Sequence, residues 1–188
     1  MSFRATVVLV ARDTAFATLR CLTAVARLPE DAGFETVVVD NGSTDATPQI
    51  LAGIEGDFTV LRNEADTGFG PACDQAAAIA RGRHLIFLRE DAVPVDGWFD
   101  ALLGAFDARP EAGAALPLAA GIDGAVLAGE WPALAVCAEA FAAVGGLAGT
   151  GRPARAEKAT LLEGFERAGR PVVAAPGAVV LAVPEALA

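Results

Sequence analysis

The sequence has few of the residues from which metal clusters and disulfide frameworks are built. Its 188 residues include three cysteines and one histidine. Cys21, Cys73 and Cys137 lie far apart and form no C-x-x-C pair, so neither a structural zinc site nor a disulfide framework is indicated. We therefore expect reduced, buried cysteines in a cytoplasmic protein.

Positive charge is also scarce. There are 14 Lys and Arg residues against 24 Asp and Glu, which gives a formal net charge of −10. A surface of this sign repels phosphate backbones and anionic lipids, so neither nucleic acid nor a membrane surface is an expected partner. A small anionic ligand is still compatible with this charge where a metal or a helix N-terminus neutralises it locally.

Long apolar runs are missing as well, and no leader segment is expected. No stretch reaches the roughly 18 uninterrupted apolar residues of a membrane span. The first four residues lead directly into a short apolar run, without the charged start and cleavage site of a signal peptide. With 54% hydrophobic residues, the chain is long enough for one well-buried core. We therefore expect a single domain over residues 1–188.

Short apolar runs alternate with helical segments in the first half of the chain. This pattern is typical of stacked βαβ units and predicts an open α/β fold, with a mostly parallel sheet covered by helices on both faces. The expected strands are Thr6–Val10, Thr36–Val39, Phe58–Leu61 and Leu85–Leu88. The expected helices are Ala15–Leu28, Pro48–Ile54, Pro71–Arg81 and Gly97–Ala108.

The pattern weakens after Pro110. The strands expected there are Ala114–Ala119, Ala125–Ala128 and Val172–Val183, the last of them broken by Pro176. The expected helices are Ala138–Val144 and Ala156–Ala168.

Polar residues that directly follow two strands mark the expected ligand edge, because a parallel sheet binds ligands beyond the carboxyl ends of its strands. Asp40, with Asn41 and Ser43 after it, is suited to accept hydrogen bonds from a base or ribose, although this stretch is also typical of a turn and helix cap. Glu90 and Asp91 supply the oxygen ligands that hard divalent cations prefer, although a strand-end acidic pair is often only solvated.

Two glycines lie between the third strand and the third helix. Gly68 and Gly70 flank Phe69 and allow the backbone to approach a ligand closely. Their spacing to Cys73 and Asp91 is also close to a dinucleotide fingerprint, which keeps a nicotinamide-dependent oxidoreductase as an alternative. However, Cys73 stands where that fingerprint has its third glycine.

Taken in order, these motifs resemble family 2 of the GT-A glycosyltransferases, in particular its rhamnosyltransferase-like branch. The resemblance extends from about Thr6 to Phe106. The matching stretches are Val37–Asp45, Arg62–Asn63, Gly68–Gly70, Leu85–Asp91 and Asp96–Trp98. It implies a GT-A fold, with a nucleotide-sugar-binding half at residues 1–108 and a shortened acceptor-side half at residues 109–188.

The resemblance also implies a reaction, the inverting transfer of a sugar from a nucleotide-diphosphate donor to the hydroxyl of an unknown acceptor. Asp91 would bind Mg²⁺ or Mn²⁺ on the diphosphate. The donor-binding residues that it implies are Asp40, Asn41, Ser43, Asn63, Gly68, Phe69, Gly70 and Glu90.

Several residues depart from the family's pattern. Arg89 lies within the metal motif, where it could pair with Glu90 and weaken metal binding, or hold phosphate directly. In the later acidic stretch only Glu157 remains, followed by Lys158, so Glu157 is the one candidate for the general base. A second hypothesis is therefore a catalytically degenerate domain that acts as a nucleotide-binding or assembly module. Because the second half is short, a second copy or a partner protein is expected to complete the acceptor site.

Overall fold

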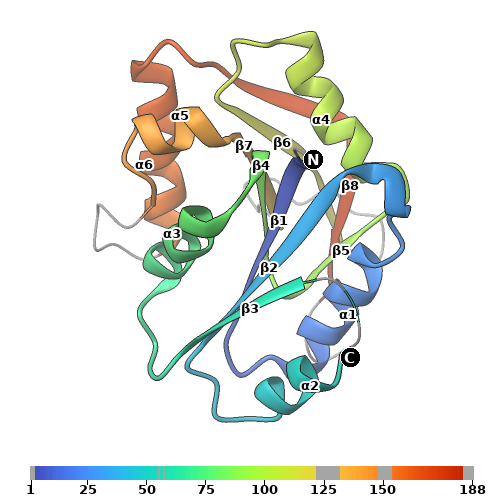
Figure 1. Ribbon diagram of the computed structural model, residues 1–188. Helices are drawn as coiled ribbons and strands as arrows, with labels where there is room; N and C mark the ends of the chain where they lie inside the picture. Colours follow the sequence, from blue (N-terminus) through green and yellow to red (C-terminus); the bar gives the residue numbers. More distant parts are fainter. Residues whose placement is uncertain (1–2, 55, 57, 122–131, 148–153, 184–188) are drawn as a thin grey trace.

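A computed structural model describes residues 3–54, 56, 58–121, 132–147 and 154–183, and these form one eight-stranded sheet with helices on both faces (Figure 1). The strands are β1 (Phe3–Ala11), β2 (Phe34–Asn41), β3 (Phe58–Asn63), β4 (Gly82–Leu88), β5 (Ala92–Pro94), β6 (Ala114–Gly121), β7 (Ala133–Cys137) and β8 (Val172–Ala182). The helices are α1 (Ala15–Val25), α2 (Thr47–Gly53), α3 (Phe69–Ile79), α4 (Trp98–Ala108), α5 (Ala138–Ala143) and α6 (Ala154–Arg167), with a short 3-10 helix η1 (Glu30–Ala32).

The strand order places a topological switch point in the middle of the sheet. The order is β3-β2-β1-β4-β7-β6-β8-β5. The chain leaves β1 toward β2 and β3, and then returns to pair β4 with the other side of β1, with all of these pairs parallel. Ligands of open α/β sheets bind beyond the carboxyl ends of the strands at such a point. The gap between the ends of β1 and β4 is therefore the position to examine.

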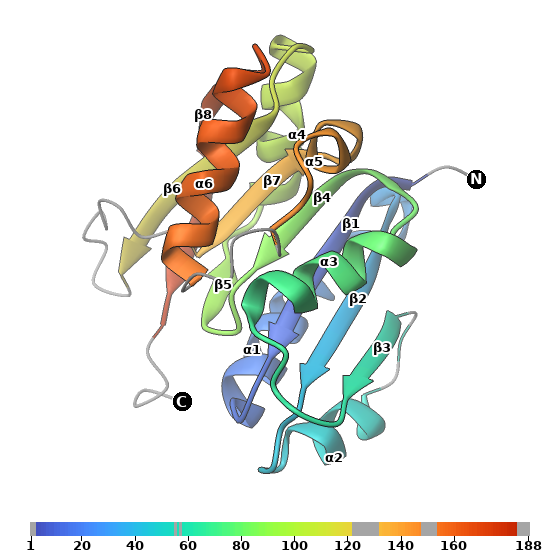
Figure 2. The same ribbon diagram turned by 90° about the vertical axis from the view of Figure 1, so that its left-hand side faces the viewer.

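Each face of the sheet carries its own layer of helices (Figure 2). Val7 and Leu9 of β1 pack with α1, α2 and α4, whereas Val8 and Val10 pack with α3, α5 and α6. Because side chains alternate between the two faces, a strand covered on both sides is apolar at every position. This burial explains the continuous apolar runs of the first four strands.

The α4 helix shows why these segments become covering helices. Trp98, Leu102 and Phe106 recur every four residues, and all three are buried against the sheet. In the α3 helix the buried positions are small, since Ala72, Cys73 and Ala76 let its backbone lie close to β1 and β2. Among the helices that the structure describes, none is both long and apolar enough to cross a membrane.

The α/β architecture predicted from the sequence is confirmed, with a mostly parallel sheet and helices on both faces. β5 and β7 were not predicted, and both form antiparallel pairs. The expected break at Pro176 appears in the pairing of the last strand: β8 runs from Val172 to Ala182, but its register with β6 moves from Pro117–Ala175 to Leu118–Val179 and leaves 176–178 unpaired with β6. The expected strand Ala125–Ala128 lies outside the described residues.

Candidate functional site

The carboxyl ends of β1, β2 and β4 bring the acidic loops to one edge of the sheet. Ala11 of β1 lies opposite Asp40 of β2, and Leu9 lies opposite Leu88 of β4. β2 and β4 lie on either side of β1, so the ends of these two strands are two strand spacings, or roughly 10 Å, apart across the sheet. The expectation that residues 40 and 91 belong to a common edge therefore agrees with the strand register.

In the loop after β4, the expected metal ligand Asp91 forms an ion pair with Arg89. Arg89 donates from Nε to Oδ1 of Asp91 at 2.9 Å and from Nη2 to Oδ2 of the same carboxylate. The two side chains are 31% and 19% exposed. Arg89 was expected to pair with Glu90 or with phosphate, and the structure pairs it with Asp91 instead.

The backbone of this loop is held from three directions. The N–H of Arg89 donates to the carbonyl of Pro132 at 2.9 Å, and the N–H of Val183 donates to the carbonyl of Asp91 at 3.0 Å. The thiol of Cys21 on α1 donates to the carbonyl of Arg89 at 3.7 Å. Three separate segments thus fix the position from which Arg89 and Asp91 extend.

Glu90, between Arg89 and Asp91 in the sequence, is partly buried. Burial raises the pKa of its carboxyl group, while the charges of Arg89 and Lys158 act in the opposite direction. Lys158 is on α6, with its Nζ 5.1 Å from the ring centre of Phe69. Two cationic side chains from different elements therefore act on the same acidic loop.

Asp40 is the last but one residue of β2, directly before the turn that follows this strand. Its carboxylate is 1% exposed, and Oδ1 accepts a hydrogen bond from the N–H of Ser43 at 2.9 Å. Oδ2 lies 3.7 Å from Nε of Arg62, which is an ion pair but too long for a hydrogen bond. Within the described part of the chain, Oδ2 is a buried oxygen without a hydrogen-bond donor.

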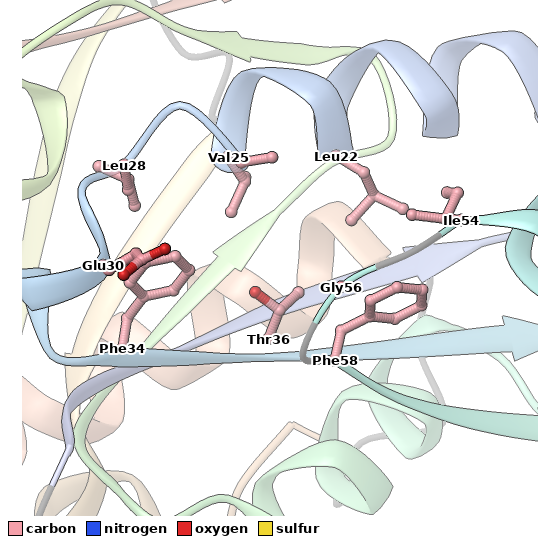
Figure 3. Close-up of a pocket in the computed structure, with 10 residues that line it drawn as sticks. Leu22, Val25, Leu28, Glu30, Phe34, Thr36, Ile54, Gly56 and Phe58 are labelled. Carbon is pink, nitrogen blue, oxygen red and sulfur yellow. The ribbon is translucent and has the colours of Figure 1, made fainter.

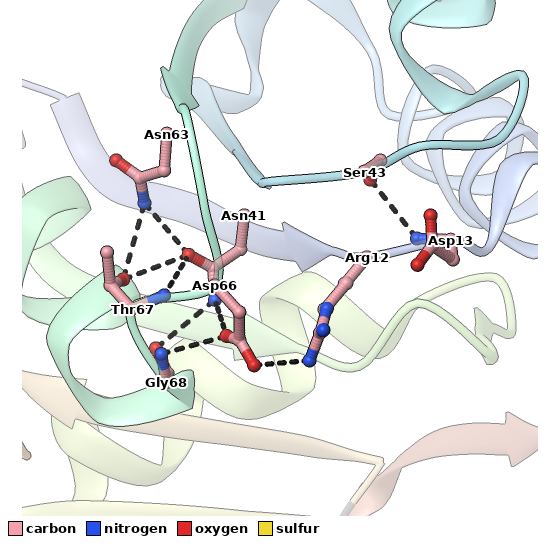
Figure 4. Close-up of polar contacts among 8 residues, drawn as sticks. All are labelled: Arg12, Asp13, Asn41, Ser43, Asn63, Asp66, Thr67 and Gly68. Carbon is pink, nitrogen blue, oxygen red and sulfur yellow. Dashed lines mark hydrogen bonds and ion pairs between the residues drawn. The ribbon is translucent and has the colours of Figure 1, made fainter.

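Asn41 links three loops at this edge (Figure 4). Its Oδ1 accepts hydrogen bonds from Nδ2 of Asn63 at 2.9 Å and from the N–H and hydroxyl of Thr67 at 3.1 and 2.9 Å. Its Nδ2 donates to Asp66 at 2.7 Å, and Asp66 in turn forms an ion pair with Arg12 after β1. The loops that follow β1, β2 and β3 are thereby tied together.

The first turn of α3 contacts the start of α6. A Cβ atom at Gly70 would lie 2.8 Å from Oε1 of Glu157, so any larger residue there would require the Glu157 carboxylate to move. The N–H of Gly70 donates to the carboxylate of Glu157, which is 4% exposed. Burial, and to a smaller extent the charge of Asp74, raise the pKa of Glu157. Glu157 is thus enclosed between the two helices.

The predicted site residues therefore form three groups. Asn41, Asn63 and Gly68 share the loop network, since Asn41 also donates to the Gly68 carbonyl at 3.4 Å. Phe69 and Gly70 lie beside α6. The remaining predicted residues are Asp40 near the end of β2, Ser43 on the turn after it, and Glu90 and Asp91 on the loop after β4.

These residues do not fit a metal centre as they are arranged. In the described ranges, no group of three or more His, Cys, Asp or Glu side chains could hold a metal ion. Both oxygens of Asp91 already accept from Arg89. A divalent cation would have to displace the guanidinium to reach them.

A separate cavity of about 500 Å³ lies at the opposite end of the strands (Figure 3). Phe34 and Phe58, at the starts of β2 and β3, line it together with Leu22 and Val25 of α1. Its walls are mostly apolar, with Glu30 as the only acid among the lining residues that the structure describes. It offers no pair of acids for a diphosphate, so we do not assign the site to it.

Comparison with known proteins decides the family. Residues 6–127, more than half of the chain, match the sequence model described as glycosyl transferase family 2. The chain belongs to glycosyl transferase family 2. A search among curated proteins gave no match. The GT-A fold expected for this family 2 chain is confirmed by similar solved structures.

Three of these structures cover nearly all of the family 2 chain. The mannosyltransferase PcManGT from Pyrobaculum calidifontis, in complex with GDP-Man and Mn²⁺, is 20% identical with a TM-score of 0.73 over 98% of this chain and 58% of its own. S. aureus TarS (1–349) is 16% identical with a TM-score of 0.78 over 96% and 60%, respectively. GalNAc-T7 with UDP, GalNAc and Mn²⁺ is 17% identical with a TM-score of 0.77 over 97% and 43%. The family 2 chain thus spans less than two thirds of the length of each.

Sequence reasoning missed the residues of the loop after β1. Arg12 and Asp13 directly follow an apolar run, so the rule that selected Asp40 and Asp91 also applies to them. Oδ1 of Asp13 accepts hydrogen bonds from the N–H groups of Thr44 and Asp45 at 2.6 and 3.2 Å. The bond from the Thr44 N–H is the main cause that lowers the pKa of Asp13. This contact holds the turn after β2 against β1.

Glu157→Gln is expected to stabilise the family 2 chain increasingly as the pH rises. Because burial raises the pKa of Glu157 above its ordinary value of 4.5, the folded protein retains a proton that the unfolded chain releases. The stability from this group is therefore present at low pH and is lost as the pH rises above that value. At neutral pH the gain should be about 1 kcal/mol, because Oε2 of Glu157 is buried and accepts no hydrogen bond from the residues that the structure describes.

Urea unfolding at several pH values would measure this difference. The control is Glu163→Gln, which removes an exposed carboxylate from the same helix. If the two variants changed the free energy of unfolding by the same amount at every pH, the expected cost of a buried charge at Glu157 would be contradicted.

Proposed function

We propose that this family 2 chain binds a nucleotide-diphosphate sugar at the carboxyl edge of β1, β2 and β4, and transfers the sugar to an acceptor hydroxyl. The observation that carries the proposal is the placement of Asp40 and of residues 89–91 on either side of β1 at the switch point. Two similar structures were solved with GDP-Man or with UDP and GalNAc, which supports a nucleotide-sugar donor.

Asp40 is the proposed contact for the nucleoside. Its buried Oδ2 accepts no hydrogen bond from the residues that the structure describes. Buried polar atoms normally have a partner, and a base N–H or a ribose hydroxyl would supply one. The linked side chains of Asn41 and Asn63 would form the adjoining wall on the side of β3.

Glu157 is the proposed general base for an inverting attack of the acceptor hydroxyl on the anomeric carbon. Its raised pKa is in the direction that a base working near neutral pH requires. The carboxylate is enclosed by Gly70, so this role requires the first turns of α3 and α6 to separate before the acceptor can reach it.

A catalytically degenerate domain that only binds nucleotide is the second candidate. Sugar transfer would use the carboxylates of Asp91 and Glu157, and both already have partners. Asp91 is paired with Arg89, and Glu157 accepts a hydrogen bond from Gly70, which favours this second candidate. Lys158, next to Glu157, adds a cation rather than a second acid. Such a domain would act as a binding or assembly module.

Titration with UDP, GDP and dTDP tests the donor site. The resemblance places Mg²⁺ or Mn²⁺ on Asp91, whereas Arg89 occupies the same oxygens, so each titration is performed with and without Mn²⁺. Binding of one nucleotide is the expected result, and no binding in either condition would contradict the proposal. Transfer or donor hydrolysis that Asp91→Ala abolishes would support the enzyme, whereas binding without turnover on a broad acceptor panel would support the degenerate domain.

We also propose where the protein is located, to which branch of family 2 it belongs and whether it acts together with a second chain. Free Cys21, Cys73 and Cys137 are compatible with a reducing cytoplasm. The order of Arg62–Asn63 and Gly68–Gly70 supports the rhamnosyltransferase-like branch. We also propose that a second copy or a partner protein completes the acceptor site, where Lys158 follows Glu157 in place of a second acid. A monomeric mass together with full activity would contradict that last part.

A further inference from the structure

We propose that Arg62 binds the base of the nucleotide, and that Arg62 and Asp40 together select a base with a ring N–H beside a carbonyl, as in uracil, thymine and guanine. This inference rests on the proposed function, because it names the ligand chemistry of the same donor site. It starts from an ion pair that leaves a buried oxygen of Asp40 without a hydrogen bond.

The sheet holds Asp40 and Arg62 side by side. They are partners in the parallel register of β2 and β3, and paired residues of neighbouring strands extend from the same face of a sheet. The next pair in this register is Asn41 with Asn63, and a hydrogen bond of 2.9 Å joins these two side chains. The ends of the two strands are therefore fixed relative to each other.

The ion pair does not complete the hydrogen bonding of Asp40. Oδ1 accepts from the N–H of Ser43 at 2.9 Å, which fixes the orientation of the carboxylate. Oδ2 lies 3.7 Å from Nε of Arg62, beyond hydrogen-bond distance, and accepts no hydrogen bond from the residues that the structure describes. Buried acceptors normally have a donor, so Oδ2 marks the place of a ligand N–H.

Arg62 supplies donors next to this acceptor. Its side chain is 59% exposed, since β3 is the last strand at this edge of the sheet, and it can shift as a base approaches Oδ2. Among the described residues, its guanidinium forms the ion pair with Asp40 and no hydrogen bond. A guanidinium has five N–H donors, so it can donate to a ligand while it remains beside the carboxylate.

The position of Arg62 along the edge favours the base over the diphosphate. The strand order is β3-β2-β1-β4, so Arg62 lies three strand spacings, or roughly 14 Å, from the end of β4 across the sheet. The family resemblance implies that the diphosphate lies at Asp91, in the loop after β4. Arg62 is thus at the far end of the proposed donor site, beyond Asp40, where the base would lie.

An acceptor beside a donor matches the edge of particular bases. In uracil, thymine and guanine, the ring N–H can donate to Oδ2 of Asp40 while the neighbouring carbonyl accepts from Arg62. In cytosine and adenine the corresponding ring nitrogen has a lone pair, which would face the buried carboxylate. A site built to hydrogen-bond its ligand rejects an analogue that lacks the group, because a buried polar atom is then left unpaired.

The test measures the affinity for UDP, dTDP, GDP, CDP and ADP by calorimetry. One of the first three is expected to bind, with CDP and ADP weaker by about tenfold or more. Arg62→Ala should weaken the favoured nucleotide by about tenfold, and change the Kd of CDP and ADP by less than about threefold. A structural defect alone would weaken all five nucleotides by the same factor, so the ratio of affinities is the decisive measurement.

Arg81→Ala is the matched control. Arg81 also forms an ion pair with an acid of β2, the 10% exposed Glu35, but at the opposite end of that strand. This variant should bind every nucleotide as the wild type does. If Arg62→Ala fails to fold, Arg62→Lys retains the charge beside Asp40 with fewer donors, and should weaken the favoured nucleotide more than CDP or ADP.

The outcomes separate the two proposals. If the wild type bound CDP or ADP as tightly as the best of UDP, dTDP and GDP, base selection would be overturned and the proposed function would stand. If Arg62→Ala weakened all five nucleotides equally, or none of them, the role of Arg62 would be overturned. Absence of binding to every nucleotide would overturn the proposed function, and the role of Arg62 with it.

Discussion

Gly82→Ala is expected to lower the free energy of unfolding by about 3 kcal/mol, at the upper end of the range for overpacking. A Cβ atom at this position would lie 2.3 Å from the backbone nitrogen of Thr6 and 2.4 Å from the carbonyl carbon of Ala5. These are backbone atoms of the neighbouring strand β1, so no side chain can move aside. The two central strands would have to separate where β4 begins.

The midpoint of urea unfolding would measure this effect. Gly104→Ala is the control, because Gly104 is an exposed position in α4 with no described atom within 4 Å of the added carbon. That control should stabilise the protein by about 0.5–1 kcal/mol, since alanine favours a helix more than glycine does. Equal midpoints for the two variants would show that the β1–β4 contact is looser than the structure indicates.

Gly42→Ala is expected to reduce both stability and nucleotide affinity. Gly42 has a φ of +79°, and a Cβ atom there would lie 2.6 Å from the backbone of Ala65. The loop after β3 would have to move away from β2, which would break the hydrogen bond that Asn41 donates to Asp66 and the one that it accepts from Thr67. We expect a loss of about 2–3 kcal/mol from the clash and the backbone strain together. The affinity should fall about tenfold as the wall beside Asp40 opens.

Calorimetry and urea unfolding would measure the two effects separately. Gly169→Ala is the matched control, because Gly169 has a similar φ of +69° but no described neighbour within 4 Å of its added carbon. It lies after α6 and before β8, at the opposite edge of the sheet. It should lose about 1 kcal/mol of stability from the backbone alone and no affinity. If Gly42→Ala bound nucleotide with the wild-type affinity, the hydrogen-bond network around Asn41 would not contribute to nucleotide binding.

The first half of the fold could be predicted because its local patterns agree with its tertiary structure. Strands such as Thr36–Val39 are covered on both faces, so burial appears in the sequence as an unbroken apolar run. The second half gives less information. Ala133–Cys137 is a short run of mostly small residues, and its position between β4 and β6 depends on long-range pairing that no local pattern records.

The candidate site divides in the same way. The rule on strand ends locates Asp40 and Asp91 at one edge from the sequence. The bond between Asn41 and Asn63 requires the register of β2 against β3, and the ion pair of Arg12 with Asp66 joins residues 54 positions apart. The pairing of Arg89 with Asp91, rather than with Glu90, depends on side-chain directions in a short turn. Such contacts depend on the folded structure, so residue order alone did not reveal them.

β5 belongs to the first half of the chain but pairs with β8, beyond β7 and β6, so the two halves of the chain are interleaved in one sheet. A fragment that stopped at Ala108 would leave the hydrogen-bonding edge of β4 open to any other extended chain, and aggregation would be its normal fate. Such a fragment would also lack Pro132, whose carbonyl accepts a hydrogen bond from the N–H of Arg89. Residues 1–108 therefore do not form an independently folding unit that contains the ligand edge. A truncated or split version of the protein has to retain the strands β6, β7 and β8.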